Sequence, residues 1–192
     1  MEQVIDEKKQ LKLLIASDLH GSAYWTRRLV ERFQEECFCK LVLLGDILYH
    51  GPRNDLPRDY NPKQVIEMLS PLASKIICVK GNCEAEVDQM VLPFDVSSEY
   101  ATIFDGEADL VMHLHHGHNH QPPAARGDAV ISGHTHVPVL EIVDGIIHLN
   151  PGSVSIPKGG SINSYAVYQN QHFSIRSFNG TMSMEVANED KN

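Results

Sequence analysis

The sequence lacks the features of membrane-spanning and disulfide-stabilised proteins. Its apolar runs reach about six residues, far short of the ~18 that a transmembrane helix needs. Residues 1–12 are polar and contain no apolar segment of the kind found in secretory signals. Only 4 of the 192 residues are cysteine, and none forms a CxxC pair. We therefore expect a cytoplasmic protein with free thiols and no membrane partner.

An excess of basic residues is also missing. Lysine and arginine number 16 against 25 acidic residues, which gives a formal net charge of −9. Nucleic-acid-binding domains usually carry a basic patch or have an isoelectric point above ~9. We therefore expect no nucleic-acid-binding surface. A small anionic substrate would need a local cation, and a bound metal ion is often the largest local charge in a site.

The chain length and its pattern indicate an α/β fold. A hydrophobic content of 42% in 192 residues suits one domain. We expect a single domain over residues 11–180, with flexible ends at 1–10 and 187–192. The first half alternates apolar runs with amphipathic segments, whereas the second half is mostly strand-like.

Three apolar runs in the first half predict buried strands: Leu11–Ser17, Leu41–Leu44 and Ile76–Val79. Helical periodicity predicts one helix over Ser22–Glu36 and another that begins near Pro62 and extends its apolar stripe to Leu72. Strands are expected in the second half at Ala101–Phe104, Asp109–His115, Ala129–Ser132, Val137–Val143, Ile146–Leu149, Tyr165–Tyr168 and Phe173–Phe178. Asp144-Gly145 between two of these runs is typical of a hairpin turn.

Histidine is clustered in one part of the chain. Of 11 histidines, seven lie between His113 and His136. Such a cluster indicates metal binding. The alternative is a solvated histidine-rich loop. A purification tag does not fit, because these histidines lie in the middle of the chain among glycines and apolar strand residues.

Five short motifs share one arrangement, in which potential metal ligands follow an apolar run. They are Asp18-Leu19-His20, Gly45-Asp46, Gly81-Asn82-Cys83-Glu84, His116-Gly117-His118 and Gly133-His134-Thr135-His136. Ligands of open α/β sheets bind beyond the carboxyl ends of the strands, and glycine allows the backbone to turn tightly there. Each motif alone could be an ordinary turn. Together they predict one crevice with several metal ligands.

These motifs, in this order, resemble the calcineurin-like metallophosphoesterase superfamily, from about Lys12 to Phe178. The stretches His50–Asn54, Gly81–Asp88 and Asn150–Gly159 resemble the small bacterial phosphodiesterases of the YfcE type. The resemblance implies a four-layer α-β-β-α sandwich, in which two mixed sheets are flanked by helices. It also implies a metal-dependent phosphodiesterase that acts on a small phosphodiester substrate.

The resemblance further implies two metal sites that share Asp46. One ion would be held by Asp18, His20, Asp46 and His136, and the other by Asp46, Asn82, His116 and His134. Nitrogen and oxygen ligands suit Mn²⁺, Fe or Zn²⁺, and the resemblance favours Mn²⁺. A hydroxide bridging the two ions would attack the phosphorus in line.

Asp46, Asn82, Cys83 and His118 are the expected catalytic residues, and Arg53 and Asn54 the expected substrate contacts. Cys83 departs from the superfamily pattern, which has histidine after Gly-Asn. A thiol is a weak donor, so we expect poor help to the leaving group unless His118 or a water substitutes. Alternatively, Cys83 is a small side chain with no role, and Arg53 is a solvated surface residue.

Two other functions remain open at this stage. One is a non-catalytic scaffold of the same fold that binds proteins, and the other is a phosphomonoesterase. All seven expected ligand positions carry ligand-type residues, which favours catalysis over the scaffold. The resemblance also suggests a homo-oligomer.

Overall fold

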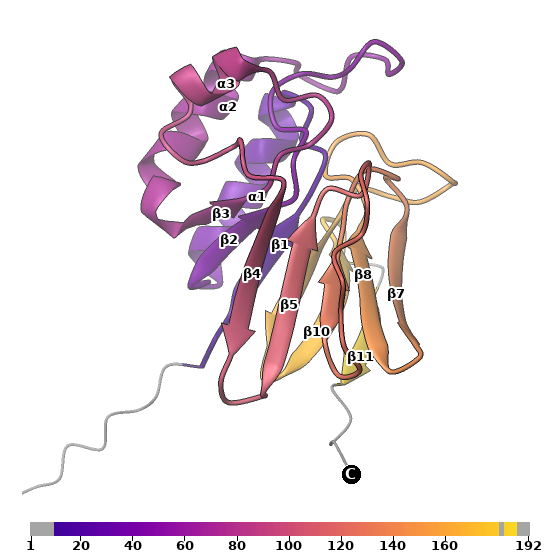
Figure 1. Cartoon of the computed structure of the whole chain (residues 1–192). Coiled ribbons are helices and arrows are strands. Elements are labelled where there is room, and N and C mark those ends of the chain that lie inside the picture. The colour runs from indigo at the N-terminus through magenta and orange to yellow at the C-terminus, as the bar shows by residue number, and fades with distance from the viewer. Residues whose placement is uncertain (1–9, 181–182, 188–192) are drawn as a thin grey trace, which may run out of the picture.

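Two β-sheets pack face to face in the computed structural model, which describes residues 10–180 and 183–187 (Figure 1). The six-stranded sheet has the order β11-β10-β9-β1-β2-β3, and the five-stranded sheet has the order β4-β5-β6-β8-β7. Both contain parallel and antiparallel pairs. The predicted α/β fold with two mixed sheets is therefore confirmed.

The strand bounds agree with the predicted runs to within a few residues. The six-stranded sheet contains β1 (Leu13–Ala16), β2 (Lys40–Leu43), β3 (Ile76–Cys78), β9 (Ser164–Gln169), β10 (His172–Ser177) and β11 (Ser183–Ala187). The five-stranded sheet contains β4 (Tyr100–Asp105), β5 (Leu110–His115), β6 (Ala129–Ile131), β7 (Pro138–Val143) and β8 (Ile146–Pro151).

The continuous apolar run of β1 is explained by its place between two cores. Leu14 and Ala16 face a core shared with the helices, whereas Leu13 and Ile15 face the core between the two sheets. Successive side chains of a strand point to opposite faces, so a central strand covered on both sides must be apolar throughout. All four residues are fully buried.

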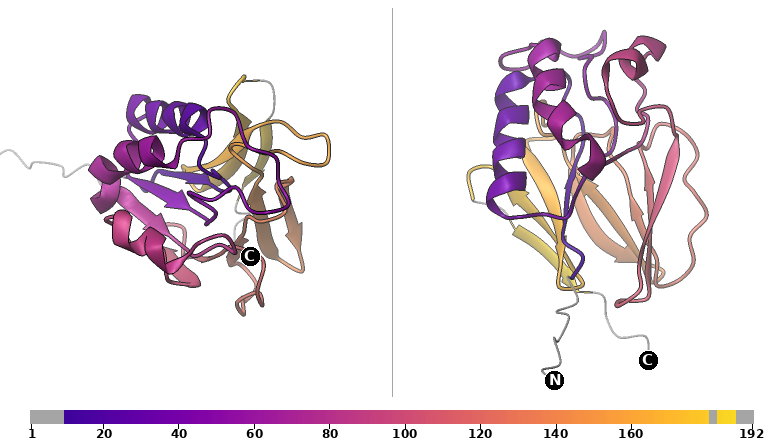
Figure 2. Two further views of the ribbon diagram at one scale, coloured as in Figure 1. Left: turned by 90° about the horizontal axis from the view of Figure 1, so that it is seen from above. Right: turned by 90° about the vertical axis from the view of Figure 1, so that its left-hand side faces the viewer.

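Two helices cover the outer face of the six-stranded sheet (Figure 2). Helix α1 (Ala23–Glu35) begins after Ser22, whose side chain caps the helix by accepting the backbone N–H of Trp25. Helix α2 (Pro62–Leu69) begins with proline after the capping residue Asn61. The predicted stripe to Leu72 continues into the 3₁₀ helix η1 (Ser70–Lys75), because Pro71 lacks the N–H that an α-helix would use.

Three features differ from the sequence prediction. Helix α3 (Glu86–Val91) and strand β11 were not predicted, and Ala187, expected in a flexible end, is the last residue of β11. In the described residues the irregular segment 116–128, and no helix, joins β5 to β6 on the five-stranded sheet, so the helical cover of the expected sandwich lies on the other sheet. The predicted ends 1–9 and 188–192 lie outside the described residues. None of the described helices is long and apolar enough to cross a membrane.

Candidate metal centre and pocket

The carboxyl ends of five strands bring the predicted ligands to one edge of the sandwich. Asp18 and His20 follow β1, Asp46 follows β2 and Asn82 follows β3. His116 follows β5, and His134 and His136 follow β6. Strands β1, β2 and β3 are parallel to one another, as are β5, β6 and β8, so their ends meet at the same side.

Asp18, His20 and His136 form a buried cluster. Asp18 Oδ1 lies 3.3 Å from His136 Nε2 and 3.7 Å from His20 Nε2. The two Nε2 atoms are 3.2 Å apart. Each ring binds a backbone carbonyl through Nδ1, His20 to Tyr49 at 2.8 Å and His136 to Ile156 at 2.5 Å.

Those carbonyls fix the ring tautomers. A carbonyl accepts a hydrogen bond, so Nδ1 of each ring carries a proton, and in the neutral form of the ring Nε2 presents a lone pair. Two lone pairs and the buried Asp18 Oδ1, which has no hydrogen-bond partner in the described residues, then point at one another. This arrangement suits a metal cation, and outer carbonyls that orient histidine in this way are typical of metal sites.

Asp46, His116 and Asn82 form a second cluster beside the first. His116 Nε2 lies 3.0 Å from Asn82 Oδ1 and 3.5 Å from Asp46 Oδ1, while its Nδ1 donates to the Leu44 carbonyl at 2.6 Å. The other carboxylate oxygen of Asp46 lies 3.7 Å from His20 Nε2. Asp46 therefore faces both clusters.

His134 and His118 lie around His116. The His134 backbone N–H donates to Asp18 Oδ2 at 3.1 Å, and its ring centroid lies 5.1 Å from that of His116. The His118 ring is 5.3 Å from His116 and 6.2 Å from His134. However, His118 lines a neighbouring hollow with Glu99 and Tyr100 rather than the pocket at Asp46.

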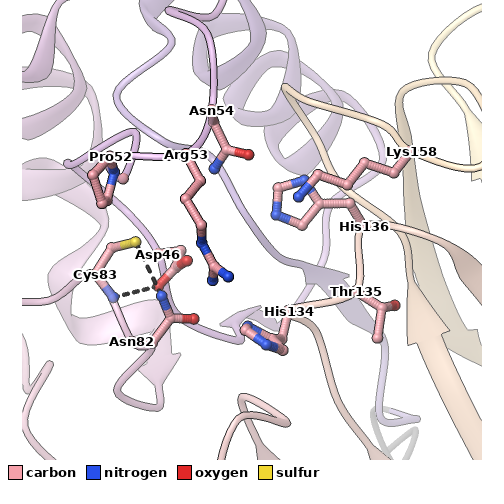
Figure 3. A pocket seen from close by; sticks show the side chains of 11 residues that line it. Asp46, Pro52, Arg53, Asn54, Asn82, Cys83, His134, Thr135, His136 and Lys158 are labelled. Carbon is pink, nitrogen blue, oxygen red and sulfur yellow. Dashed lines mark hydrogen bonds between the residues drawn. The ribbon is translucent and has the colours of Figure 1, made fainter.

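A pocket of about 430 Å³ opens over the two clusters (Figure 3). Asp46, Asn82, Cys83, His134 and His136 lie on its walls. The predicted substrate residues Arg53 and Asn54 also line it, and so does Lys158, which the sequence analysis did not single out. Its only sequence signal was its place in the Asn150–Gly159 stretch.

The backbone around the clusters is strained. Asp18, His20, Asp46, His134 and His136 have φ angles of 58°, 47°, 55°, 67° and 61°. Such left-handed conformations cost about 1–3 kcal/mol for residues other than glycine and gather at functional sites. The strain falls on five of the seven predicted ligands, a distribution that is typical of functional sites.

Two glycines allow the second and third motifs to meet. Gly45 has φ of 91°, and a Cβ there would lie 2.5 Å from the Gly81 backbone nitrogen. A Cβ at Gly81 would in turn collide with the Asp46 carboxylate and lie 2.5 Å from the Asp46 nitrogen. Only glycine permits this close approach.

The buried charges have shifted pKa values. Burial alone would raise the pKa of Asp18, but the close approach of His136 and the nearby His116 and His20 hold that pKa below the ordinary value. Burial lowers the pKa of His20 and of His134. Burial, followed by the charge of Asp46, raises the pKa of the Cys83 thiol. Cys83 is therefore a neutral thiol beside Asp46.

Comparisons with known proteins identify the family of this chain. The model of the calcineurin-like phosphoesterase superfamily domain matches residues 11–172, so the chain belongs to that superfamily. The chain is 44% identical over 173 residues to the phosphodiesterase YfcE of Escherichia coli K12. The aligned region covers 88% of this chain and 93% of the relative.

Solved structures show the same relationship. The structure of the phosphoesterase YfcE from E. coli superposes with a TM-score of 0.88 at 42% identity, over 92% of this chain and 99% of that one. A Vps29 bound to Zn²⁺ from Entamoeba histolytica superposes with a TM-score of 0.61 at 19% identity, over 92% and 97% of the two chains. At that identity, the second likeness shows the fold alone.

Proposed function

We propose that the protein hydrolyses phosphate diesters with two divalent metal ions, most readily Mn²⁺. The observation that carries this proposal is the position of Asp46 between two clusters of nitrogen and oxygen donors. The 44% identity to a phosphodiesterase supports the choice of a diester. The four free cysteines support the cytoplasm as its place of action.

The residues present fit two ions. Asp18, His20, Asp46 and His136 would hold one, and Asp46, Asn82, His116 and His134 the other. Imidazole nitrogens and hard oxygens suit Mn²⁺, Fe and Zn²⁺. When bound, the ions would supply a hydroxide that is nucleophilic at neutral pH and would offset the charge that grows on the phosphoryl oxygens.

The chain's own side chains complete the reaction. Asp46 and Asn82 orient the reacting groups at the floor of the pocket, and Arg53 and Asn54 reach the phosphate from its wall. Proton delivery to the leaving alcohol falls to the neutral thiol of Cys83 or, from the side, to His118. A thiol donates weakly, so good leaving groups are favoured.

Hydrolysis of bis-p-nitrophenyl phosphate beside p-nitrophenyl phosphate tests the proposal. The protein is stripped of metal, refilled with Mn²⁺ and compared with Asp46→Asn. We expect Mn²⁺-dependent cleavage of the diester, reduced about 10²-fold or more in the variant, because the metal contribution is worth several kcal/mol. Calorimetric titration of Mn²⁺ gives a second readout, which should show weakened binding in Asp46→Asn.

Absence of turnover of either ester with any divalent ion would refute the proposal and favour the protein-binding scaffold. Faster cleavage of the monoester than of the diester would favour the phosphomonoesterase. Sedimentation of the same samples would test the homo-oligomer suggested by the resemblance.

A further inference from the structure

Two cationic side chains stand on the walls of the pocket, away from the predicted metal ligands. Arg53 comes from the loop after β2, and Lys158 from the loop after β8 (Figure 3). The guanidinium points into the middle of the pocket, and the Lys158 side chain extends from its loop toward the pocket. Among the residues that the structure describes, they are the two lysine or arginine residues that line this pocket, and Asp46 is its one acidic lining residue.

Neither cation is neutralised within the described part of the chain. No ion pair links Arg53 or Lys158 to a carboxylate of residues 10–180 or 183–187. The chain as a whole carries a formal charge of −9, so two unpaired cations at one pocket contrast with the acidic character of the protein. Unpaired arginine and lysine in a cleft are typical of anion recognition.

Hydrogen bonds anchor the backbone at Lys158 to His136, one of the predicted metal ligands. The Lys158 backbone N–H donates to the carbonyl of His136 at 3.2 Å, and its own carbonyl accepts the Ser161 hydroxyl at 2.6 Å. The His136 ring binds the carbonyl of Ile156, two residues before the lysine. The same histidine thus fixes this loop through both its ring and its backbone.

The loop that carries Arg53 is fixed to the other side of the centre. Its neighbour Tyr49 accepts the bond from His20 Nδ1, and the Asn54 amide donates to the His50 carbonyl at 2.8 Å. Gly51 lies so close to Cys83 that an added Cβ would be 3.1 Å from the sulfur. Both loops are therefore anchored beside the predicted metal ligands, and each carries its cation to the wall of the pocket.

The charge of a simple diester does not account for both cations. Two divalent ions would more than offset Asp18, Asp46 and the single negative charge of the diester phosphate. Resting on the proposed function, in which Arg53 contacts the scissile phosphate, we propose that Lys158 binds a second anionic group, a phosphate or a carboxylate, carried by one of the two esterified alcohols. The preferred substrates are then diesters with an additional negative charge.

Three diesters with the same p-nitrophenol leaving group test this inference. They are thymidine 5′-(p-nitrophenyl phosphate), the same compound with a 3′-phosphate, and p-nitrophenyl phosphorylcholine. In the wild type we expect kcat/KM to be highest for the 3′-phosphate compound and lowest for the choline ester. The 3′-phosphate should raise kcat/KM roughly 10- to 100-fold, the size of one charge-assisted hydrogen bond.

Lys158→Met should abolish most of that preference while leaving the thymidine ester without a 3′-phosphate nearly unchanged, and Lys158→Arg should retain it. Lys63→Met is the matched control, because Lys63 is an exposed lysine of α2 outside the pocket. An equal loss on all three esters would overturn the inference, since Lys158 would then act on the scissile phosphate. The absence of any preference in the wild type would also overturn it.

Binding separates this inference from the proposed function. Calorimetry with the Mn²⁺-loaded protein should show that thymidine 3′,5′-bisphosphate binds more tightly than thymidine 5′-phosphate, and that Lys158→Met removes the difference. This result without turnover of any ester would sustain the anion site while refuting hydrolysis. Turnover of the esters with equal binding of the two nucleotides would support hydrolysis and refute the second anion site.

Discussion

The carboxylate of Glu84 accepts the backbone N–H of Asp46 at 2.9 Å. It also accepts the N–H groups of Ile47 at 2.6 Å and Gly81 at 2.5 Å. Glu84 thus joins the loop after β2 to the loop after β3. Burial and the charge of Asp46 raise its pKa to about 7. The side chain contacts no predicted ligand atom in these bonds and acts by positioning the backbone of Asp46.

We expect Glu84→Gln to weaken both the fold and the metal centre. An amide places an NH₂ group where a carboxylate oxygen accepts, so at least one backbone N–H loses its partner at a cost of about 1–3 kcal/mol. Loss of a supporting contact should reduce Mn²⁺ affinity by ~10–100-fold. Urea unfolding and calorimetric titration measure the two effects. Glu86→Gln, an exposed change in α3, is the control, and equal Mn²⁺ affinity in both variants would argue against this role.

Cys83→His should speed hydrolysis of esters with poor leaving groups. The raised pKa of the thiol makes it a poor proton donor at neutral pH, whereas imidazolium can act as a general acid, worth up to ~10²–10⁴-fold. The gain should be larger for an alkyl p-nitrobenzyl diester than for bis-p-nitrophenyl phosphate. Cys83→Ser keeps the size without the imidazole and should show no gain. An unchanged rate in Cys83→His on both esters would refute the idea.

The sequence predicted the sheets well because their strands have a strong apolar signal. A fully buried strand such as β1 is apolar at every position, whereas a helix covered on one side shows polar residues on its other face. Helix α3 gave no such signal. It has 6 residues, and its apolar members Val87, Met90 and Val91 are exposed rather than packed as a stripe.

The potential ligands of the site could be predicted from the sequence, but the hydrogen bonds that support them could not. Potential ligands at strand ends are local features, so Asp18, Asp46 and His116 could be read from the chain. The supporting bonds are not local: Glu84 meets Asp46 across 38 positions, and Asn150 meets Gly133 across 17. The adjacent histidines His115 and His116 also differ: Nδ1 of His116 donates to the Leu44 carbonyl, whereas Nδ1 of His115 has no hydrogen-bond partner in the described residues. This difference depends on how β5 lies in its sheet.

Asn150→Ala should loosen the loop that carries His134 and His136. The buried Asn150 amide donates to the Gly133 carbonyl at 2.7 Å and to the Thr135 hydroxyl at 3.1 Å. Alanine leaves these acceptors unpaired, so we expect a loss of about 1–3 kcal/mol of stability and ~10–100-fold weaker Mn²⁺ binding. Asn119→Ala, an exposed change, is the control. A stability loss without any change in Mn²⁺ affinity would limit Asn150 to a structural role.

His115 should make the metal-free protein sensitive to acid. Its Nδ1 is buried without a hydrogen-bond partner in the described residues, and burial, with His116 and His118 nearby, lowers its pKa to about 4. The ordinary pKa of histidine is about 6.5. Between these two values the unfolded chain binds a proton that the native protein does not, so the free energy of unfolding falls as the pH drops through this window and is unaffected by His115 above it.

His115→Phe isolates this contribution. The ring packs against Tyr100, with centroids 6.5 Å apart, so phenylalanine keeps an aromatic contact while removing the titration. Urea unfolding of the metal-free proteins from about pH 7 to about pH 4 should give a shallower decline in the variant. His20 and His134, whose pKa values are also lowered by burial, are present in both proteins and cancel in the comparison. Parallel curves for the two proteins would show that His115 takes up its proton as readily in the native state as in the unfolded one.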